Sequence, residues 1–407
     1  MQQRTPSGHV PTLIASFLHF DVSFMLWVLL GALGIYIAES AGLSPAQKGL
    51  IVAIPTLSGS LMRIPVGVLS DRLGAKPVGV ALLAFLFVPL AIGWQVGTNL
   101  PVLVAVGLML GTAGASFAVA LPLASRWYGP ERQGLAMGVA AAGNSGTVIA
   151  NLAAPQLANL FGWHSVLALA MIPLAVVLAA FTLLAKESPN RPPRQSAQAY
   201  VRALRVGDMW WFALLYSITF GGYVGLSSFL PLFFHDQYGA SAVVAGVITS
   251  GGAFIGSSVR PIGGYIADKV GGVKLLSVLL LGICIAYGLS ATSPSLALMV
   301  LVVLTLMACL GLGNGAVFQL VPQRFRDNIG MATGVVGAIG GLGGFLVPIL
   351  LGSMNQATES FGPGFAVLAV AAFAGFCMLR LLAAVAHGWR LSWRLPTPAD
   401  MWTPEAS

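Results

Sequence analysis

The strongest constraint on the fold is a series of long apolar runs that contain almost no charge. Only 8% of the 407 residues are charged, whereas a soluble domain usually carries about 25%. A helix needs roughly 20 mostly apolar residues to cross a bilayer. The runs predict an all-α membrane protein with twelve transmembrane helices, near residues 12–38, 46–70, 77–96, 100–124, 133–158, 163–185, 209–234, 241–267, 273–291, 295–322, 328–355 and 361–386.

The placement of the basic residues supports this count. Of the 20 Lys and Arg residues, Arg63 and Arg260 fall inside spans, and only Lys48 of the others lies on the side of the first interhelical loop. Cytoplasmic loops are enriched in Lys and Arg, so both termini are expected in the cytoplasm and the chain in the cell inner membrane. The net charge of +8 then reflects orientation in the lipid bilayer, and nucleic acid is not an expected partner.

A repeated motif divides the chain into two halves. The segment from Arg63 to Gly74 matches the segment from Arg260 to Gly271 at an offset of 197 residues, with the Arg, Gly, Asp, basic and Gly positions all recurring. Secondary transporters are commonly built from repeated halves around a midplane site. The expected organisation is an N-terminal six-helix bundle, a cytoplasmic linker, and a C-terminal six-helix bundle with a short cytoplasmic tail, at residues 1–185, 186–208 and 209–407.

The first copy of this motif resembles the loop motif of the major facilitator superfamily, which joins the second and third helices. It reads Gly67-x-x-x-Asp71-Arg72-x-Gly74-x-Lys76. The resemblance implies the major facilitator fold.

Three further stretches resemble the nitrate/nitrite porter family within that superfamily. They are the glycine-rich residues 140–146 and 334–344, which look like paired nitrate signatures, and residues 311–325. The resemblance covers essentially the whole chain and is closest to the bacterial assimilatory nitrate transporters. It implies a secondary active transporter that takes up nitrate and nitrite by alternating access, coupled to protons.

The two arginines within spans are the principal candidates for anion binding. An arginine near the middle of a membrane helix costs at least about 2.5–3.5 kcal/mol on insertion scales. Arg63 and Arg260 occupy equivalent positions of the two halves, and a planar guanidinium can donate two parallel hydrogen bonds to a flat anion. The alternative is an arginine that pairs with a buried acid or extends to the membrane surface.

Several aromatic residues are predicted near the anion. The resemblance implies that Tyr216 hydrogen-bonds it and that three phenylalanines sandwich its flat face: Phe117, Phe220 and Phe318. Ordinary helix packing is the alternative for each phenylalanine.

Polar and small residues of the signature segments complete the candidate binding site. Asn144 and Asn314 are amides in glycine-rich spans, and an amide in lipid otherwise seeks a partner on another helix. The site glycines are Gly143, Gly340 and Gly341. Small residues also let helices approach and slide, and we expect this packing role to be the larger one for the glycines.

Charged residues at the ends of two spans are candidates for gating. Asp71 with Arg72, and Asp268 with Lys269, follow the second and eighth spans. We expect these charges to hold one access state closed. Topological anchoring accounts for the cations but not for the repeated aspartates.

A proton-coupled carrier also needs a group that gains and loses a proton, and acids within spans serve such relays. Asp21 is the first candidate and Glu39 the second. A structural pairing of Asp21 with a neighbouring polar group is the alternative.

Other functions remain open or are disfavoured. The chain could exchange nitrate for nitrite, or carry another small monovalent anion such as cyanate or formate, without changing the physical argument. The five His and three Cys residues are scattered, so no enzymatic activity, metal site, disulfide or cofactor is expected. The expected partners are the anion, protons and the bilayer, and the chain is expected to act as a monomer.

Overall fold

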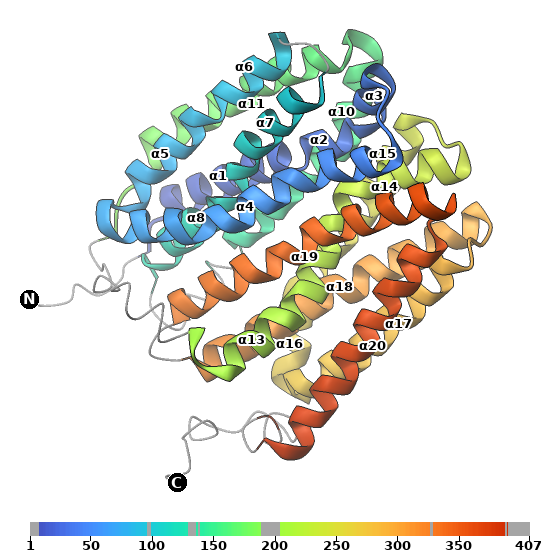
Figure 1. The fold of residues 1–407 in the computed structure, drawn as a ribbon. Coiled ribbons are helices and arrows are strands. Elements are labelled where there is room, and N and C mark those ends of the chain that lie inside the picture. The colour runs from blue at the N-terminus through green and yellow to red at the C-terminus, as the bar shows by residue number, and fades with distance from the viewer. Residues whose placement is uncertain are drawn as a thin grey trace, which may run out of the picture.

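The computed structural model describes residues 8–95, 99–128, 136, 139–188, 204–325, 329–386 and 389. Within these ranges the secondary structure is helical and no strand occurs. Figure 1 shows the blue-to-green helices and the yellow-to-red helices as two groups packed side by side. The part of the chain that the structure describes is therefore all-helical, as predicted for an all-α membrane protein.

The first half is built from short and long helices that follow one another closely. Their bounds are α1 (Val10–Trp27), α2 (Leu29–Ala32), α3 (Gly34–Ala41), α4 (Pro45–Leu73), α5 (Ala75–Phe85), α6 (Phe87–Gln95), α7 (Leu100–Gly111), the 3-10 helix η1 (Thr112–Ser116), α8 (Phe117–Ser125), the 3-10 helix η2 (Ala142–Ser145), α10 (Gly146–Phe161) and α11 (Trp163–Leu184).

The second half has fewer interruptions. Its elements are α13 (Gly207–Tyr216), the π-helix η3 (Ser217–Gly221), α14 (Gly222–Tyr238), α15 (Ala242–Ser258), α16 (Arg260–Val270), α17 (Gly272–Ala291), α18 (Leu296–Arg324), α19 (Ile329–Thr358) and α20 (Gly362–Val385).

Eleven helical segments in the described ranges are long and apolar enough to cross a membrane. The expected fifth span corresponds to η2 and α10, and α10 alone has 16 residues. Residues 133–135, 137 and 138, at the start of that expected span, lie outside the described ranges. The expected linker is also largely outside them, since residues 189–203 are not described.

Several expected spans are broken where the sequence pattern predicts continuous helices. The first span divides at Val28 and Leu33 into α1, α2 and α3, and the eighth divides at Val259. Hydropathy does not reveal the breaks at Val28 and Leu33 because the residues on both sides are apolar. The break at Val259 places Arg260 at the first residue of α16.

The repeated motif ends both of its helices in the same way. α4 and α16 stop at Gly74 and Gly271, whose φ angles are 109° and 94°. These positive values strongly favour glycine because its missing Cβ removes the steric conflict. The last glycine of each repeat therefore turns the chain into the next helix.

The two halves meet along α4 and α19, but only over part of their length. At the end of the bundle near Lys48, here called the Lys48 end, a Cβ on Gly49 would strike the backbone of Pro348, and one on Gly352 would strike Pro45. At the opposite end, here called the Asp71 end, a Cβ on Gly334 would meet nothing within 4 Å. The helices are thus packed closely at the Lys48 end and part toward the Asp71 end.

Polar contacts between the halves are also found at the Lys48 end. The Lys48 ammonium lies 2.9 and 2.7 Å from the two carboxylate oxygens of Asp236. Nearby, the backbone N–H of Ala46 donates to Gln356 at 3.1 Å. These contacts join α4 to α14 and α19 across the interface.

Candidate functional site

Arg63 lies in the middle of α4 and is almost completely buried, with 1% of its surface exposed. Its Nε donates to the carbonyl of Gly114 at 3.2 Å, and its Nη1 donates to the carbonyl of Gly337 at 2.5 Å. Gly114 belongs to the first half and Gly337 to the second, so this side chain connects them. The buried Nη2 has no hydrogen-bond partner among the described residues.

Aromatic rings surround the Arg63 guanidinium. Its Cζ lies 5.4 Å from the Trp27 ring, 5.2 Å from Phe117 and 5.0 Å from Phe220. A cation within about 6 Å of an aromatic face is attracted by the ring quadrupole. These contacts offset part of the desolvation cost without occupying an N–H group, so the unpaired Nη2 can donate to an anion.

Arg260 occupies the equivalent position but is less enclosed. It is half-buried, and its Nη2 donates to the Tyr216 hydroxyl at 3.3 Å. Its Cζ lies 5.5 Å from the Phe318 ring and 6.0 Å from Phe220. Phe220 therefore has a guanidinium of each half near it.

Neither arginine is neutralised by an acid among the residues that the structure describes. Within the described ranges, the ion pairs involve other residues, and no carboxylate lies within 4 Å of Arg63 or Arg260. The predicted alternative of a permanent buried ion pair is therefore not found in that part of the chain.

The structure brings Tyr216, Phe220 and Phe318 into one aromatic cluster. The Tyr216 and Phe220 rings are parallel, with centroids 4.8 Å apart and an interplanar angle of 1°. Phe318 meets the edge of Tyr216 at 4.8 Å and faces Phe117 at 6.1 Å. In this state Phe220 stacks on Tyr216, and the Tyr216 hydroxyl accepts a hydrogen bond from Arg260. The sequence analysis instead placed the phenylalanine faces against the anion.

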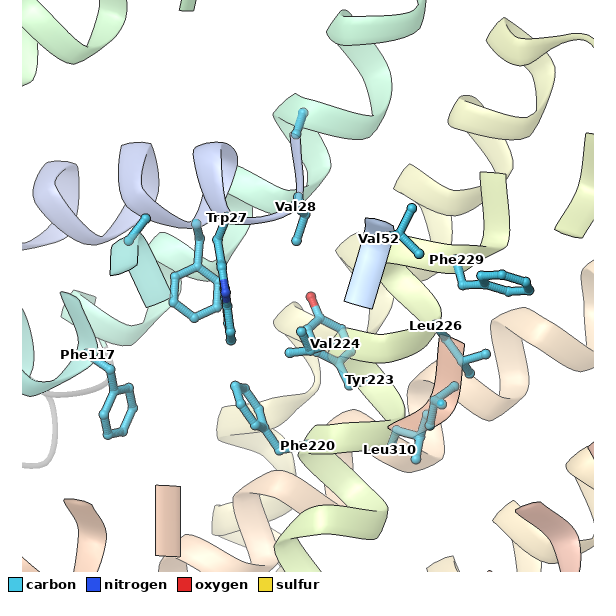
Figure 2. Packing of buried hydrophobic residues seen from close by; sticks show 14 of the residues in the cluster. Trp27, Val28, Val52, Phe117, Phe220, Tyr223, Val224, Leu226, Phe229 and Leu310 are labelled. Atoms are coloured by element: carbon cyan, nitrogen blue, oxygen red, sulfur yellow. The ribbon is translucent and has the colours of Figure 1, made fainter. Parts of the chain in front are cut away.

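Trp27 belongs to this cluster although the sequence analysis did not select it. Figure 2 shows Trp27 of the first half beside Phe220 of the second, and their ring centroids are 6.5 Å apart. The indole N–H donates to the Pro55 carbonyl at 2.7 Å. A Cβ on Gly59 or Gly114 would collide with the indole, so these glycines make room for it. A single Trp in an apolar run gives no sequence signal of this role.

Asn144 and Asn314 are both buried, and the Oδ1 of each lacks a hydrogen-bond partner in the described part of the chain. The carbonyl of Asn144 accepts from Thr147 Oγ1 at 2.7 Å, and Thr147 lies 3.3 Å from the Tyr223 hydroxyl. The Asn144 segment is thereby linked to the second half. No hydrogen bond joins either described Asn to Arg63 or Arg260.

The three candidate glycines are positions of close helix packing. A Cβ on Gly143 would approach the backbone of α1, at Asp21 N, to 2.8 Å. One on Gly340 would overlap the Tyr216 ring, and one on Gly341 would overlap the Ser60 hydroxyl. Close packing is therefore one role of all three glycines, and their part in anion binding stays a prediction.

The charged residues at the ends of the two helices lie in different surroundings. Asp71 binds Arg126, at the end of α8, with an N–O distance of 2.8 Å, and Arg72 is exposed. Asp268 is also exposed, and the Lys269 ammonium lies 4.6 Å from the Tyr265 ring centroid. Asp71 binds Arg126 and not the adjacent Arg72, because adjacent residues on a helix point in different directions. Gating by these groups stays a prediction.

The two proton-coupling candidates lie in different environments. Asp21 is half-buried in α1 and accepts a hydrogen bond from Ser145 at 2.6 Å, directly beside Asn144. Glu39 is exposed at the Lys48 end, 3.6 Å from His235 Nε2. Only Asp21 contacts a signature segment.

Comparisons with known proteins agree with this architecture. Residues 15–348 match the family model described as "Major Facilitator Superfamily". The nitrite extrusion protein of Bacillus subtilis is 35% identical over 88% of this chain and 90% of its own length. A Mycobacterium tuberculosis protein named as a probable nitrate/nitrite transporter is 35% identical over 83% of this chain and 87% of its own length.

A solved structure shows the same fold. The crystal structure of the human organic anion transporter MFSD10 aligns with a TM-score of 0.70, covering 91% of this chain and 99% of the other, at 16% identity.

Proposed function

Because the chain belongs to the major facilitator superfamily and, within it, to the nitrate/nitrite porter family, we propose that it takes up nitrate and nitrite across the cell inner membrane. Anion transport without enzymatic chemistry fits relatives that are named as transporters. Twelve spans with both termini in the cytoplasm follow from the distribution of Lys and Arg.

One observation carries the proposed substrate. Two guanidinium groups without a carboxylate partner lie in an aromatic cluster, and the buried Nη2 of Arg63 has no acceptor within the described residues. A buried charge without a partner is costly, so an anion that enters the cluster gains the full attraction of both arginines. A flat anion also fits between ring faces and forked donors.

The parting of α4 and α19 supports alternating access. The halves are packed closely at the Lys48 end and part at the Asp71 end. With the Lys48 end outside, as the positive-inside rule requires, this state parts the halves on the cytoplasmic side while Arg63 itself stays enclosed. The reverse rocking of residues 1–185 against 209–407 opens it to the outside.

The membrane potential requires a driving force for uptake. A negative interior opposes entry of a monovalent anion by about 2.3 kcal/mol per 100 mV. Proton symport supplies the missing energy in our proposal, with Asp21 as the first candidate for the proton carrier because it bonds to Ser145 beside Asn144. Glu39 is the second candidate. The transport unit is the monomer.

Exchange of external nitrate for internal nitrite is the second candidate. It is favoured by the relative named as a nitrite extrusion protein, and it requires no proton because the charges cancel. Cyanate or formate transport retains the same electrostatic argument and is tested by competition.

Purified protein in liposomes distinguishes these functions. Labelled nitrate uptake is measured with an inward proton gradient and no internal nitrite, then with internal nitrite and no gradient. Stimulation by the proton gradient supports symport, and stimulation only by internal nitrite supports exchange. Absence of nitrate uptake under both conditions, in vesicles that transport another anion, overturns the proposed substrate.

A further inference from the structure

We propose that the hydroxyl of Ser60 is a further donor to the transported anion, acting beside Arg63. Ser60 lies on α4, three residues before Arg63, and has no exposed surface. The proposal rests on the proposed function, because it requires an anion at Arg63. It adds a neutral donor to the charged groups already described.

The Ser60 hydroxyl differs from most buried hydroxyls of the helices. Ser and Thr side chains within helices commonly donate to the carbonyl four residues earlier, as Thr219, Ser227 and Ser257 do here. Ser60 Oγ makes no such bond and has no partner in the described part of the chain. Leaving a buried hydroxyl unpaired costs about 1–3 kcal/mol, so a state that supplies an acceptor is favoured.

Its position distinguishes Ser60 from other unpaired serines. Residues three apart on a helix share a face, so Ser60 and Arg63 both point toward α19. A Cβ added to Gly341 would overlap Ser60 Oγ and would lie 3.7 Å from Arg63 Nη1. The hydroxyl and the guanidinium therefore face the same short stretch of the opposite half.

Two donors of α4 lack acceptors in the same state. Arg63 Nη2 and Ser60 Oγ are both buried and unpaired within the described residues. One oxyanion with several oxygens can accept from both, whereas a halide offers a single acceptor centre. Because both atoms are closed off from solvent here, the anion reaches them when α19 moves relative to α4. Anion binding at these donors is thereby coupled to the rocking of the two halves.

Binding measurements on the full chain test this role. We compare Ser60→Ala with Ser16→Ala, since Ser16 is also fully buried, lacks a hydrogen-bond partner in the described ranges, and lies in the second turn of α1. Loss of a hydrogen bond to a charged group weakens nitrate binding by roughly ten- to hundredfold. The expected result is this loss in Ser60→Ala and wild-type binding, within about twofold, in Ser16→Ala.

Thermal unfolding without nitrate separates binding from folding. Removing an unpaired buried hydroxyl is expected to leave the melting temperature unchanged or raise it in both variants. The nitrate-induced rise in melting temperature is expected to shrink only in Ser60→Ala. If Ser60→Ala does not fold, Ser60→Cys, which retains a weak donor, is expected to bind nitrate with intermediate affinity.

Infrared spectra of bound labelled nitrate report contact directly. Unequal hydrogen bonding splits the N–O stretching bands, so loss of one donor is expected to shift them in Ser60→Ala and not in Ser16→Ala. Equal affinity and identical bands in wild type and Ser60→Ala overturn the inference alone. Absence of nitrate binding by the wild type overturns it together with the proposed function.

Discussion

Arg63 and Arg260 stand at the same position of the two repeats, yet their surroundings differ. Arg63 lies within the continuous helix α4, is 1% exposed, and donates to carbonyls of both halves. Arg260 begins α16 after the break at Val259, is half-buried, and bonds to Tyr216 of its own half. Sequence equivalence therefore places both arginines at one depth without giving them equal roles.

In this conformation Arg63, and not Arg260, connects the two halves. Its Nη1 reaches Gly337 of α19, on the helix that packs most closely against α4 near the Lys48 end. The contacts of Arg260 are to Tyr216, Phe220 and Phe318, all in the second half. Nitrate affinity should consequently depend more on the geometry of Arg63 than on that of Arg260.

The largest effect is expected for Arg63→Lys. Lysine keeps the charge but has all its donors on one nitrogen, so it cannot span the positions from which Nε and Nη1 reach two carbonyls while Nη2 faces the anion. We expect a loss of about 3 kcal/mol, roughly a hundredfold rise in the nitrate Kd, measured by equilibrium binding. An unchanged Kd in protein of normal melting temperature would remove Arg63 from the binding site.

Arg260→Lys is expected to have a smaller effect. Its charge remains near Phe318, and among the described residues its side chain hydrogen-bonds to Tyr216 alone. A loss of about 1.4 kcal/mol corresponds to a tenfold rise in the nitrate Kd. Equal losses in Arg260→Lys and Arg63→Lys, measured in the same binding assay, would show that the repeat position alone sets the contribution.

Tyr216→Phe tests the support of Arg260 separately. The phenyl ring keeps the parallel stack on Phe220 but loses the hydroxyl that accepts from Arg260. We expect a nitrate Kd about fivefold higher, equivalent to roughly 1 kcal/mol. In a double-mutant cycle, Tyr216→Phe should have little effect on the nitrate Kd when Arg260→Lys is already present, because both changes remove the same hydrogen bond. Full additivity contradicts this arrangement.

The smallest effect is expected for Gly337→Ala. Its new methyl would lie 3.4 Å from Arg63 Nη1, whereas the methyl of the matched control Gly334→Ala would meet nothing within 4 Å. We expect at most about a threefold rise in the nitrate Kd for Gly337→Ala and no change for the control. A larger loss in Gly334→Ala than in Gly337→Ala would mean that α19 approaches α4 along its whole length.

Much of this protein was determined by its sequence alone. The apolar runs establish membrane helices because every backbone polar group must be paired inside a bilayer. The offset of 197 residues between Arg63 and Arg260 identifies the two anion-binding candidates, since unneutralised intramembrane charge is retained where it is functional. The glycine at the end of each motif also follows from local backbone preference.

The tertiary structure alone decided how the two arginines differ. Trp27, Ser60 and the carbonyl of Gly337 surround Arg63 because α1, α4 and α19 converge there, and no local pattern specifies which helices meet. The pairing of Asp71 with Arg126 likewise joins residues 55 positions apart. Hydropathy indicates which segments leave water for the bilayer, whereas contacts between segments depend on the shapes of the surfaces that pack against one another.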